Sequence, residues 1–435
     1  MKLTIVGGGS NYTPACTKAL LALRDELPVE ELVLVDVNPA RLELIGGLAR
    51  RMAERAGGPF KVTLTTDLAA GVEGAEFIIS QIRVGGQEAR ILDERIPLKY
   101  GIPGHETVGP GGFSKALRTI PEVLKIAKVI EERAPQAWLI NYTNPSGLVT
   151  EALASRTRVK VVGLCDHGQG RRLYIGKIYG VDPERISFDY VGLNHMGWIT
   201  RIYLDGRDIT EEALVRIERA QRDLAKVEST VDGDVFRLLH LSVHNYLKYI
   251  YHYDRMVREE TEHGVRAEKV LEIEKQTLAE CADPNLVDIP PSLRQRGGQM
   301  ENWLFGGATG YGAVGFKVIS ALYNNKGIKE LVNTPNLGTV ECLEFDQVAE
   351  VMSLIDRAGV HPLGFGRVPL EVRGLIRQVK DHELLTIEAA VTGDYDTALK
   401  ALMIHPLVLS YDKAKAILDE YLAAHRRYLP AFFKG

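Results

Sequence analysis

Short apolar segments alternate with helical segments from residue 3 to residue 164, and this alternation limits the possible folds more than any other feature of the sequence. Strands are predicted at Leu3–Val6, Glu31–Asp36, Phe60–Thr65, Glu76–Ile82, Trp138–Asn141 and Val159–Leu164. Helices are predicted between them at Pro14–Asp25, Arg41–Ala56, Phe113–Arg133 and Ser146–Ser155. Strands that alternate with helices build a doubly wound parallel sheet, so we expect an α/β fold that binds its ligand at the carboxyl ends of the strands.

A glycine-rich turn follows the first strand. Val6 is followed directly by Gly7-Gly8-Gly9-Ser10-Asn11, and then by a helical segment. In this context Gly7 permits a tight turn, and Gly9 lets the backbone approach a pyrophosphate at the helix N-terminus. Tyr12 stands where a third glycine would complete the motif, so the motif alone is a weak match. The second strand ends in Asp36, which favours NAD over NADP if it binds a ribose hydroxyl; a solvated turn residue is the alternative.

Arginines and glycines gather after the fourth strand. We expect residues 83–112 to form a long, glycine-rich loop that contains Arg83 and Arg90. Two guanidinium groups suit an anionic substrate, and surface ion pairs are the alternative. After the fifth strand, Asn144 precedes Pro145 and either simply ends the strand or contacts sugar hydroxyls or the nicotinamide at the same edge.

Metal-binding residue types follow the sixth strand. Cys165, Asp166 and His167 come directly after it, and Asn194 and His195 interrupt a strand predicted over Ile186–Ile202. Thiolate and imidazole are common ligands of divalent metals, so we predict that Cys165 and His195 hold one divalent metal. A buried structural cysteine and a hydrogen-bonded histidine are the alternative.

Length and charge set the broad class. A chain of 435 residues is too long for one small core, so we expect two domains, residues 1–168 and residues 169–435. The net charge of -4 favours neither nucleic acid nor an anionic membrane as a partner. No apolar run approaches the roughly 20 residues of a membrane helix, and no basic-then-apolar leader follows Met1. Four scattered cysteines fit a reducing cytoplasm.

The second half is expected to be a mixed α+β, largely helical domain that carries the substrate site and the oligomerisation surface. Helices are predicted at Glu211–Glu228, through Leu238–Ile250, around Arg266, and from about Asp346 to the end. Tyr246, Tyr249 and Tyr253 have helical spacing, and we assign the last two to core packing.

Several motifs together resemble glycoside hydrolase family 4, the NAD-dependent, divalent-metal glycosidases. The resemblance covers essentially the whole chain, and within the family the segments Arg83–Gly86 and Asp93–Gly101 are most similar to 6-phospho-β-glucosidases. The motifs are Gly7–Ser10, Ile82–Gly86, Glu106–Phe113, Asn141–Gly147, Gly163–Asp166 and Gly192–His195.

The resemblance implies a Rossmann-like sheet of the lactate and malate dehydrogenase type and an elimination mechanism. The sugar of a 6-phospho-β-glucoside is oxidised at C3 by tightly bound, recycled NAD+, deprotonated at C2, and freed of its aglycone; water addition and re-reduction follow. The expected metal is Mn2+, and the expected assembly is a homodimer or homotetramer. The alternatives are a 6-phospho-α-glucosidase, an enzyme for unphosphorylated glycosides, and a dehydrogenase of the 2-hydroxyacid type.

The resemblance also assigns roles to residues. Cys165 and His195 match the metal ligands, Tyr246 the C2 base, and Asp166 a position from which a proton is donated to the leaving oxygen. A tyrosine with a pKa of about 10 needs a cationic neighbour such as Arg266 to act as a base. Positions expected to bind sugar and phosphate are Arg90, Asn144, Asn194 and Arg266; those expected to bind NAD are Gly7, Gly9, Ser10, Asn11, Asp36 and Arg83. His105 stands where the family usually has Gln, and His167 is expected to lie behind the metal site.

Overall fold

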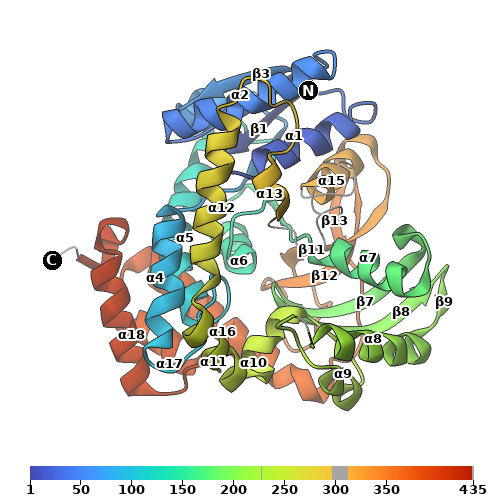
Figure 1. The fold of residues 1–435 in the computed structure, drawn as a ribbon, viewed down its shortest axis with the longest axis vertical. Coiled ribbons are helices and arrows are strands. Elements are labelled where there is room, and N and C mark those ends of the chain that lie inside the picture. Colours follow the sequence, from blue (N-terminus) through green and yellow to red (C-terminus); the bar gives the residue numbers. More distant parts are fainter. Residues whose placement is uncertain (227, 296–311, 434–435) are drawn as a thin grey trace.

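A nine-stranded sheet runs through the protein (Figure 1). The computed structural model describes residues 1–226, 228–295 and 312–433. The strand order is β13-β12-β11-β6-β5-β4-β1-β2-β3. Six of these strands come from the first half of the chain: β1 (Lys2–Val6), β2 (Glu31–Val35), β3 (Lys61–Thr65), β4 (Phe77–Ser80), β5 (Trp138–Asn141) and β6 (Lys160–Gly163).

These six strands pair in parallel, as the alternation of strands and helices predicts. Both faces of the sheet are covered, which is why β1, β2 and β4 are buried along nearly their whole length rather than at every second residue. One face packs on α1 (Thr13–Ala22), α2 (Pro39–Arg55) and α15 (Ala313–Asn324). The other packs on α3 (Leu68–Val72), α5 (Gly109–Arg133) and α6 (Ser146–Arg156).

Three strands from the second half extend the sheet. β11 (Ile328–Pro335) lies next to β6, and β12 (Val348–Asp356) and β13 (Gly359–Pro362) follow it outwards. Each is antiparallel to its neighbours. The prediction of helix from about Asp346 is therefore wrong up to residue 362, and helices resume only at Leu370. Because strands from both halves share one sheet, the division at residue 168 stays a prediction about folding units.

The sequence predicts one long loop between β4 and α5, and this prediction is wrong. Helix α4 (Gly86–Leu98) lies within the segment. The buried face of α4 is largely polar, with Arg90, Asp93 and Glu94 almost inaccessible to solvent. Helices are recognised in a sequence by an apolar stripe, and α4 has none to recognise. Arg90 therefore projects from a helix, and only Arg83 lies on the preceding turn.

The segment predicted as a helix through Leu238–Ile250 is interrupted. Helix α9 (Gly233–Leu239) ends at His240, which has a φ of 55° and cannot continue a right-handed helix. The remainder forms β10 (Ser242–Val243), the 3₁₀ turn η2 (Asn245–Leu247), α10 (Lys248–Tyr251) and α11 (Tyr253–His263). Tyr246, Tyr249 and Tyr253 therefore lie on three different elements.

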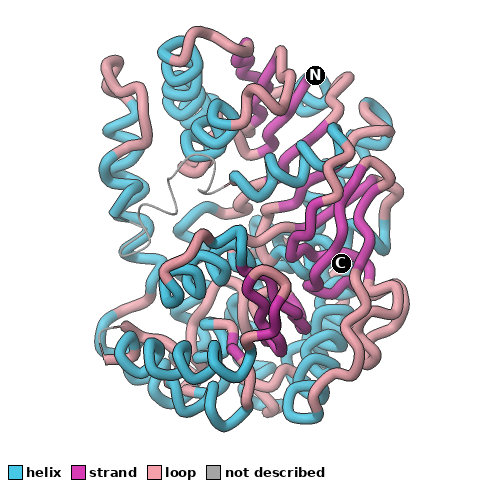
Figure 2. Tube along the Cα trace, turned by 90° about the vertical axis from the view of Figure 1, so that its right-hand side faces the viewer, coloured by secondary structure: helices cyan, strands magenta, loops and turns pink. Residues whose placement is uncertain are grey.

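A second, smaller sheet contains β7 (Ile186–Leu193) and β8 (Met196–Leu204), with β10 and β9 (Arg207–Asp208) pairing to β8. Figure 2 shows it as a separate group of strands beside the large sheet. The turn between β7 and β8 consists of Asn194 and His195, at the interruption that the sequence predicts. Around this sheet lie α7 (His167–Tyr179), the short η1 (Pro183–Arg185) and α8 (Thr210–Leu224).

The remaining helices tie the two halves together. In Figure 1, α12 (Arg266–Cys281) runs from the region of α2 along α4, and α13 (Pro291–Gln295) follows it. The C-terminal helices α16 (Leu370–Thr392), α17 (Tyr395–Ile404) and α18 (Tyr411–Ala424) share a core with α5, and the short η5 (Arg426–Tyr428) and η6 (Pro430–Phe433) end the described chain. Of the helices within the described ranges, none is long and apolar enough to cross a membrane.

Candidate active site

The turn after β1 has the shape of a nucleotide-binding turn. Gly7 has a φ of 91°, and a Cβ at this position would lie 2.8 Å from the carbonyl oxygen of Gln81. The backbone N–H of Gly9 donates to Asp36 Oδ2 at 2.9 Å, and a Cβ on Gly9 would lie equally close to that oxygen. The turn is therefore a cradle that any side chain would fill, as close approach of a pyrophosphate requires.

A residue from α2 braces this turn and was not expected from the sequence. Arg41 donates to the Gly9 carbonyl oxygen at 2.6 Å and to Asn11 Oδ1 at 2.8 Å. Its third contact is an ion pair of 2.5 Å with Glu274 on α12, so the second half of the chain helps to hold the turn. Ser10 completes the turn, donating its backbone N–H to the Gly7 carbonyl oxygen at 3.0 Å.

Cys165 and His195 meet, although 30 residues separate them. Cys165 follows β6, His195 lies in the β7–β8 turn with a φ of 65°, and the Cys165 Sγ to His195 Nε2 distance is 3.4 Å. One ion with about 2.3 Å to sulfur and about 2.1 Å to nitrogen spans such a separation. Within the described ranges, no three His, Cys, Asp or Glu side chains are grouped to hold a metal. Cys165 and His195 are the residues that would hold the ion, although a thiolate is a softer ligand than Mn2+ ordinarily selects.

The electrostatics of the pair fit metal binding as well. Burial lowers the pKa of His195 to about 4, so its ring is neutral and offers a lone pair. Burial, together with Glu350 and Asp166, raises the pKa of the Cys165 thiol above its ordinary value. A metal that binds the thiolate must therefore displace a proton, and its binding has to weaken as the pH falls.

Tyr246 lies over the metal pair. Its ring centroid is 4.8 Å from that of His195, edge to face, and 4.5 Å from that of His105. Burial raises the pKa of Tyr246, whereas Arg266 and Arg90 act to lower it. The expected influence of Arg266 is therefore present but smaller than that of burial, and a further positive charge is needed for Tyr246 to act as a base near neutral pH.

Asp166 begins α7 directly after Cys165. Burial raises the pKa of Asp166 to about 7, so the carboxyl group keeps a proton near neutral pH. Its Oδ1 atom is buried and lacks a hydrogen-bond partner among the residues that the structure describes. A protonated carboxylic acid next to a metal ligand has the form of a general acid.

Arg83 and Arg90 meet on a carboxylate that the sequence did not single out. Glu106 accepts from Arg83 at 2.5 Å, lies 3.2 Å from Arg90 Nη1, and accepts from Lys115 at 2.7 Å. Burial opposes ionisation of Glu106, but Arg83, Arg90 and Lys115 hold its pKa well below the usual range. Arg90 also donates to Glu94 at 2.7 Å, and burial lowers the pKa of Lys115 to about 7. Three basic side chains thus share two carboxylates, which leaves a small excess of positive charge for an anionic group.

Asn194 is held by another carboxylate that the sequence did not reveal. Its Nδ2 donates to Glu350 Oε1 at 2.8 Å, and Tyr190 donates to Glu350 Oε2 at 2.8 Å. Burial raises the pKa of Glu350 to about 7. Glu350 lies inside the apolar strand β12, far from Asn194 along the chain. The pairing of β11 with β6 brings β12 to the site.

The other expected site residues lie around the same edge. Asn144 precedes a cis peptide bond to Pro145, and its side-chain oxygen accepts from the Ser146 backbone at 3.3 Å. Arg266 is exposed at the start of α12, where the next backbone N–H donates to Glu94 at 2.8 Å. His167 stacks on His244 with ring centroids 3.6 Å apart. Their roles stay predictions.

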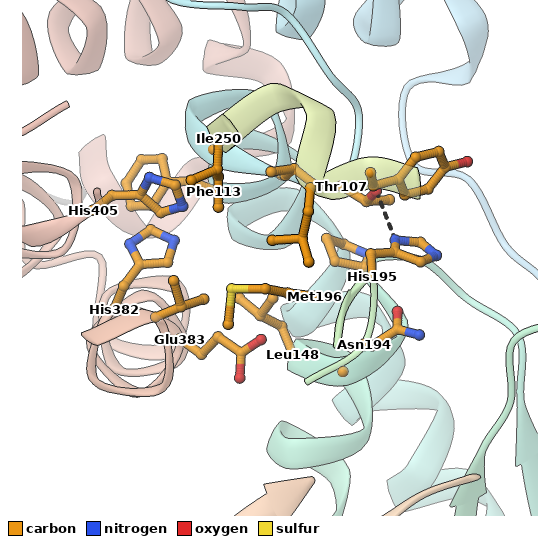
Figure 3. A pocket seen from close by; sticks show the side chains of 18 residues that line it. Thr107, Phe113, Leu148, Asn194, His195, Met196, Ile250, His382, Glu383 and His405 are labelled. Carbon is orange, nitrogen blue, oxygen red and sulfur yellow. Dashed lines mark hydrogen bonds between the residues drawn. The ribbon is translucent and has the colours of Figure 1, made fainter. Parts of the chain in front are cut away.

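A cavity of about 40 Å³ lies beside His195 and Tyr246 (Figure 3). Phe113, His382 and His405 line it on one side, at the left of Figure 3, and Asn194 and His195 line it on the other. This space holds a few water molecules and is too small for a sugar.

Comparison with known proteins decides the family. The sequence model described as family 4 glycosyl hydrolase matches residues 2–181, and that of the family 4 glycosyl hydrolase C-terminal domain matches residues 190–408. The chain belongs to glycoside hydrolase family 4. The resemblance of the motifs is thereby confirmed.

Relatives of this family 4 chain match over nearly its full length. A probable 6-phospho-β-glucosidase of Bacillus subtilis is 41% identical over 100% of this chain and 98% of its own. The 6-phospho-β-glucosidase structure of Thermotoga maritima, solved with NAD and glucose-6-phosphate, has a TM-score of 0.90 and 32% identity, covering 98% of this chain and 99% of its own. A 6-phospho-α-glucosidase structure from gut microorganisms, with NAD and Mn2+, has a TM-score of 0.88 and 27% identity, covering 99% of each chain.

The expected fold type is confirmed too. Lactate dehydrogenase of Eimeria maxima, at 13% identity, has a TM-score of 0.52 and covers 90% of this family 4 chain and 96% of its own. At this identity the likeness concerns the fold alone.

Proposed function

We propose that this chain hydrolyses 6-phospho-β-glucosides, with a 6-phosphorylated disaccharide or aryl glycoside as substrate. The observation that carries the proposal is the 3.4 Å approach of Cys165 Sγ to His195 Nε2, with Tyr246 over the His195 ring. The names of the Bacillus subtilis and Thermotoga maritima relatives support the substrate class. The Thermotoga maritima protein has also been solved with manganese, NAD+ and glucose-6-phosphate.

The proposed chemistry divides the work between bound groups and side chains. When bound, NAD+ supplies a hydride acceptor for sugar C3 and a divalent metal supplies a Lewis acid for the C3 oxygen. Gly7, Gly9, Ser10, Asn11 and Asp36 hold NAD at the turn after β1, and Arg83 contacts it from the turn after β4. Cys165 Sγ and His195 Nε2 hold the metal, for which Mn2+ is the ion that we expect.

The side chains then move the protons. Tyr246 takes the proton from C2, which the C3 ketone has made acidic, and the electron pair left on C2 expels the aglycone from C1. Asp166 gives its proton to the leaving oxygen. The Asp166 carboxylate takes a proton from the water that adds at C1, and Tyr246 returns a proton to C2. Reduced NAD would supply the hydride that restores C3. Arg90, with Asn144, Asn194 and Arg266, binds and orients the phosphate and the hydroxyl groups.

The order of the chemical steps does not by itself select the anomeric configuration of the substrate. Removal of the C2 proton precedes departure of the aglycone, so the mechanism accepts either anomer. Identity favours the β form, because the Bacillus subtilis relative is 41% identical and the 6-phospho-α-glucosidase structure 27%. An enzyme for unphosphorylated glycosides leaves the positive charge around Glu106 without an anion to bind.

The test is a panel of p-nitrophenyl α- and β-glucosides, with and without a 6-phosphate, assayed with NAD+ and Mn2+. We expect turnover of the 6-phospho-β-glucoside, no net NADH, loss of activity with EDTA and recovery with Mn2+. Substrate deuterated at C2 is expected to exchange its label with solvent. Full retention of deuterium in the product excludes the elimination route, and stoichiometric NADH release identifies a dehydrogenase instead.

Three further expectations belong to the proposal. We place the enzyme in the cytoplasm, a compartment that suits its four free cysteines, Cys16, Cys165, Cys281 and Cys342. We also expect a homodimer or homotetramer, which light scattering of the purified protein measures directly. The folding units are proposed to be residues 1–168 and 169–435.

A further inference from the structure

A line of hydrogen bonds leads away from His195 on the side opposite Cys165. His195 Nε2 faces the sulfur, and His195 Nδ1 lies 2.8 Å from the Thr107 hydroxyl oxygen, the contact drawn in Figure 3. The same hydroxyl oxygen lies 3.1 Å from Nδ1 of His105. Three side chains are thus linked in a line that ends at a ligand of the proposed metal.

The backbone of Thr107 decides where the proton of His105 lies. The Thr107 N–H donates to His105 Nδ1 at 3.2 Å. An N–H group can only donate, so His105 Nδ1 presents its lone pair, and the ring proton of neutral His105 is on Nε2. His105 is therefore an acceptor on the side that faces the Thr107 hydroxyl.

This acceptor gives the hydroxyl a direction. A threonine hydroxyl has one proton to donate and lone pairs to receive. Donation to His105 leaves the oxygen as an acceptor for an N–H on His195 Nδ1, and the lone pair of His195 is then on Nε2, facing Cys165. If the hydroxyl instead donated to His195 Nδ1, the Nε2 atom would carry the proton and could not bind a metal.

We propose that His105 is a positioning residue that acts through Thr107 to hold His195 in the tautomer with a free Nε2 lone pair. The inference rests on the proposed function, because it takes His195 as a metal ligand. Hydrogen bonds to the second nitrogen of a ligating histidine fix its tautomer and ring orientation, and their loss typically weakens metal binding about 10–100-fold.

The packing around His105 keeps its ring in place. The side chain is 5% exposed, and its ring centroid lies 4.5 Å from that of Tyr246 and 4.6 Å from that of Tyr249. A Cβ on Gly111 would overlap the His105 carbonyl oxygen, so the first turn of α5 is packed against this backbone.

The experiment measures the dissociation constant of Mn2+ from the NAD-loaded enzyme, by electron paramagnetic resonance of free Mn2+. Removal of the acceptor in His105→Leu, or of the hydroxyl in Thr107→Val, is expected to raise this constant about 10–100-fold. Because both changes interrupt the same row of hydrogen bonds, the double variant is expected to lose no more Mn2+ affinity than either single variant. His105→Asn retains an acceptor oxygen near the place of Nδ1 and is expected to recover most of the affinity.

The chain offers a matched control. His405 is also buried, and its Nδ1 accepts the backbone N–H two residues later, at 3.1 Å from Leu407 N, but this contact leads to no metal ligand. His405→Leu is expected to leave Mn2+ binding unchanged. At saturating Mn2+, His105→Leu should regain most of its kcat, because the change acts on metal occupancy.

The outcomes are distinct. An unchanged dissociation constant in both Thr107→Val and His105→Leu overturns the inference, as does an equal loss in His405→Leu. If His105→Leu fails to fold, Thr107→Val alone gives the answer, since it removes one hydroxyl. The wild-type protein tests the proposed function separately: absence of Mn2+ binding there removes the metal site itself and the inference with it.

Discussion

A buried ion pair anchors α4, the helix that carries Arg90. Removing one partner of this ion pair is the sharpest test of what stabilises the fold. Asp93 on α4 accepts from both terminal nitrogens of Arg118 on α5, at 2.8 and 2.7 Å. His425, just after α18, lies 3.0 Å from the same carboxylate. The Asp93 and Arg118 side chains are 0% and 1% exposed. Asp93→Asn therefore leaves the Arg118 charge buried without a counter-charge.

The magnitude follows from that burial. Breaking one partner of a buried ion pair costs about 3–5 kcal/mol. With an unfolding entropy of about 2.1 cal/mol/K per residue, a chain of 435 residues should lose about 3–5 °C in Tm. The control is Asp223→Asn, which removes an ion pair of 2.7 Å to Lys226 whose two side chains are 70% and 73% exposed. We expect no measurable change in Tm for it.

The pH dependence has a definite sign. Burial acts to raise the pKa of Asp93, but Arg118 and His425 outweigh it and hold the pKa at about 2. An unfolded aspartate has a pKa of about 3.9, so the stabilisation is complete above that pH and is lost as the pH falls towards about 2. Urea midpoints of wild type and Asp93→Asn should differ at neutral pH and converge in acid. A constant difference across that range, or a Tm equal to that of Asp223→Asn, contradicts the reasoning.

Three further changes test the site. Cys165→Ser replaces the thiolate with a weak ligand, so Mn2+ binding and glycosidase activity should fall at least about tenfold while NAD binding, measured by calorimetry, persists; retained Mn2+ affinity removes Cys165 as a ligand. Gly7→Ala places a Cβ 2.8 Å from the Gln81 carbonyl oxygen and should weaken NAD binding. Gly74→Ala is the control, because Gly74 also has a positive φ but has open space around it, and it should leave NAD binding unchanged. Equal losses of NAD affinity in the two variants point to backbone strain alone. Glu350→Gln offers one acceptor oxygen to the two donors Tyr190 and Asn194 and should destabilise the fold by about 1–3 kcal/mol; an unchanged Tm assigns the two contacts no net stability.

Much of the large sheet could be predicted because its signals are local. The six parallel strands are short segments of mostly apolar or β-branched residues, and each predicted segment lies within two residues of an observed strand at both ends. The turn at Gly7 needs a positive φ and an open backbone, which the residue types display directly. Cys165 and His195 were found because polar groups that follow apolar runs stand at strand ends.

Each error has its own physical cause. Periodicity detects apolar faces, and α4 buries Arg90, Asp93 and Glu94 instead, so it escaped detection. The break at His240 depends on a backbone conformation that the residue type does not require. Strand β11 pairs with β6 through Asn333 and Gly163, a contact between distant segments that neighbouring residues do not encode.

The sequence by itself determined the parallel sheet, the glycine turn and the residue types at the carboxyl edge of the sheet. Hydrophobic periodicity, turn-forming residues and the ends of strands all depend on neighbours along the chain. Only the tertiary structure decided which groups meet there. Glu106 among three cations, Glu350 under Asn194, and Thr107 between His105 and His195 are contacts across elements. Their energies come from burial and hydrogen bonding, which exist only once distant segments have packed.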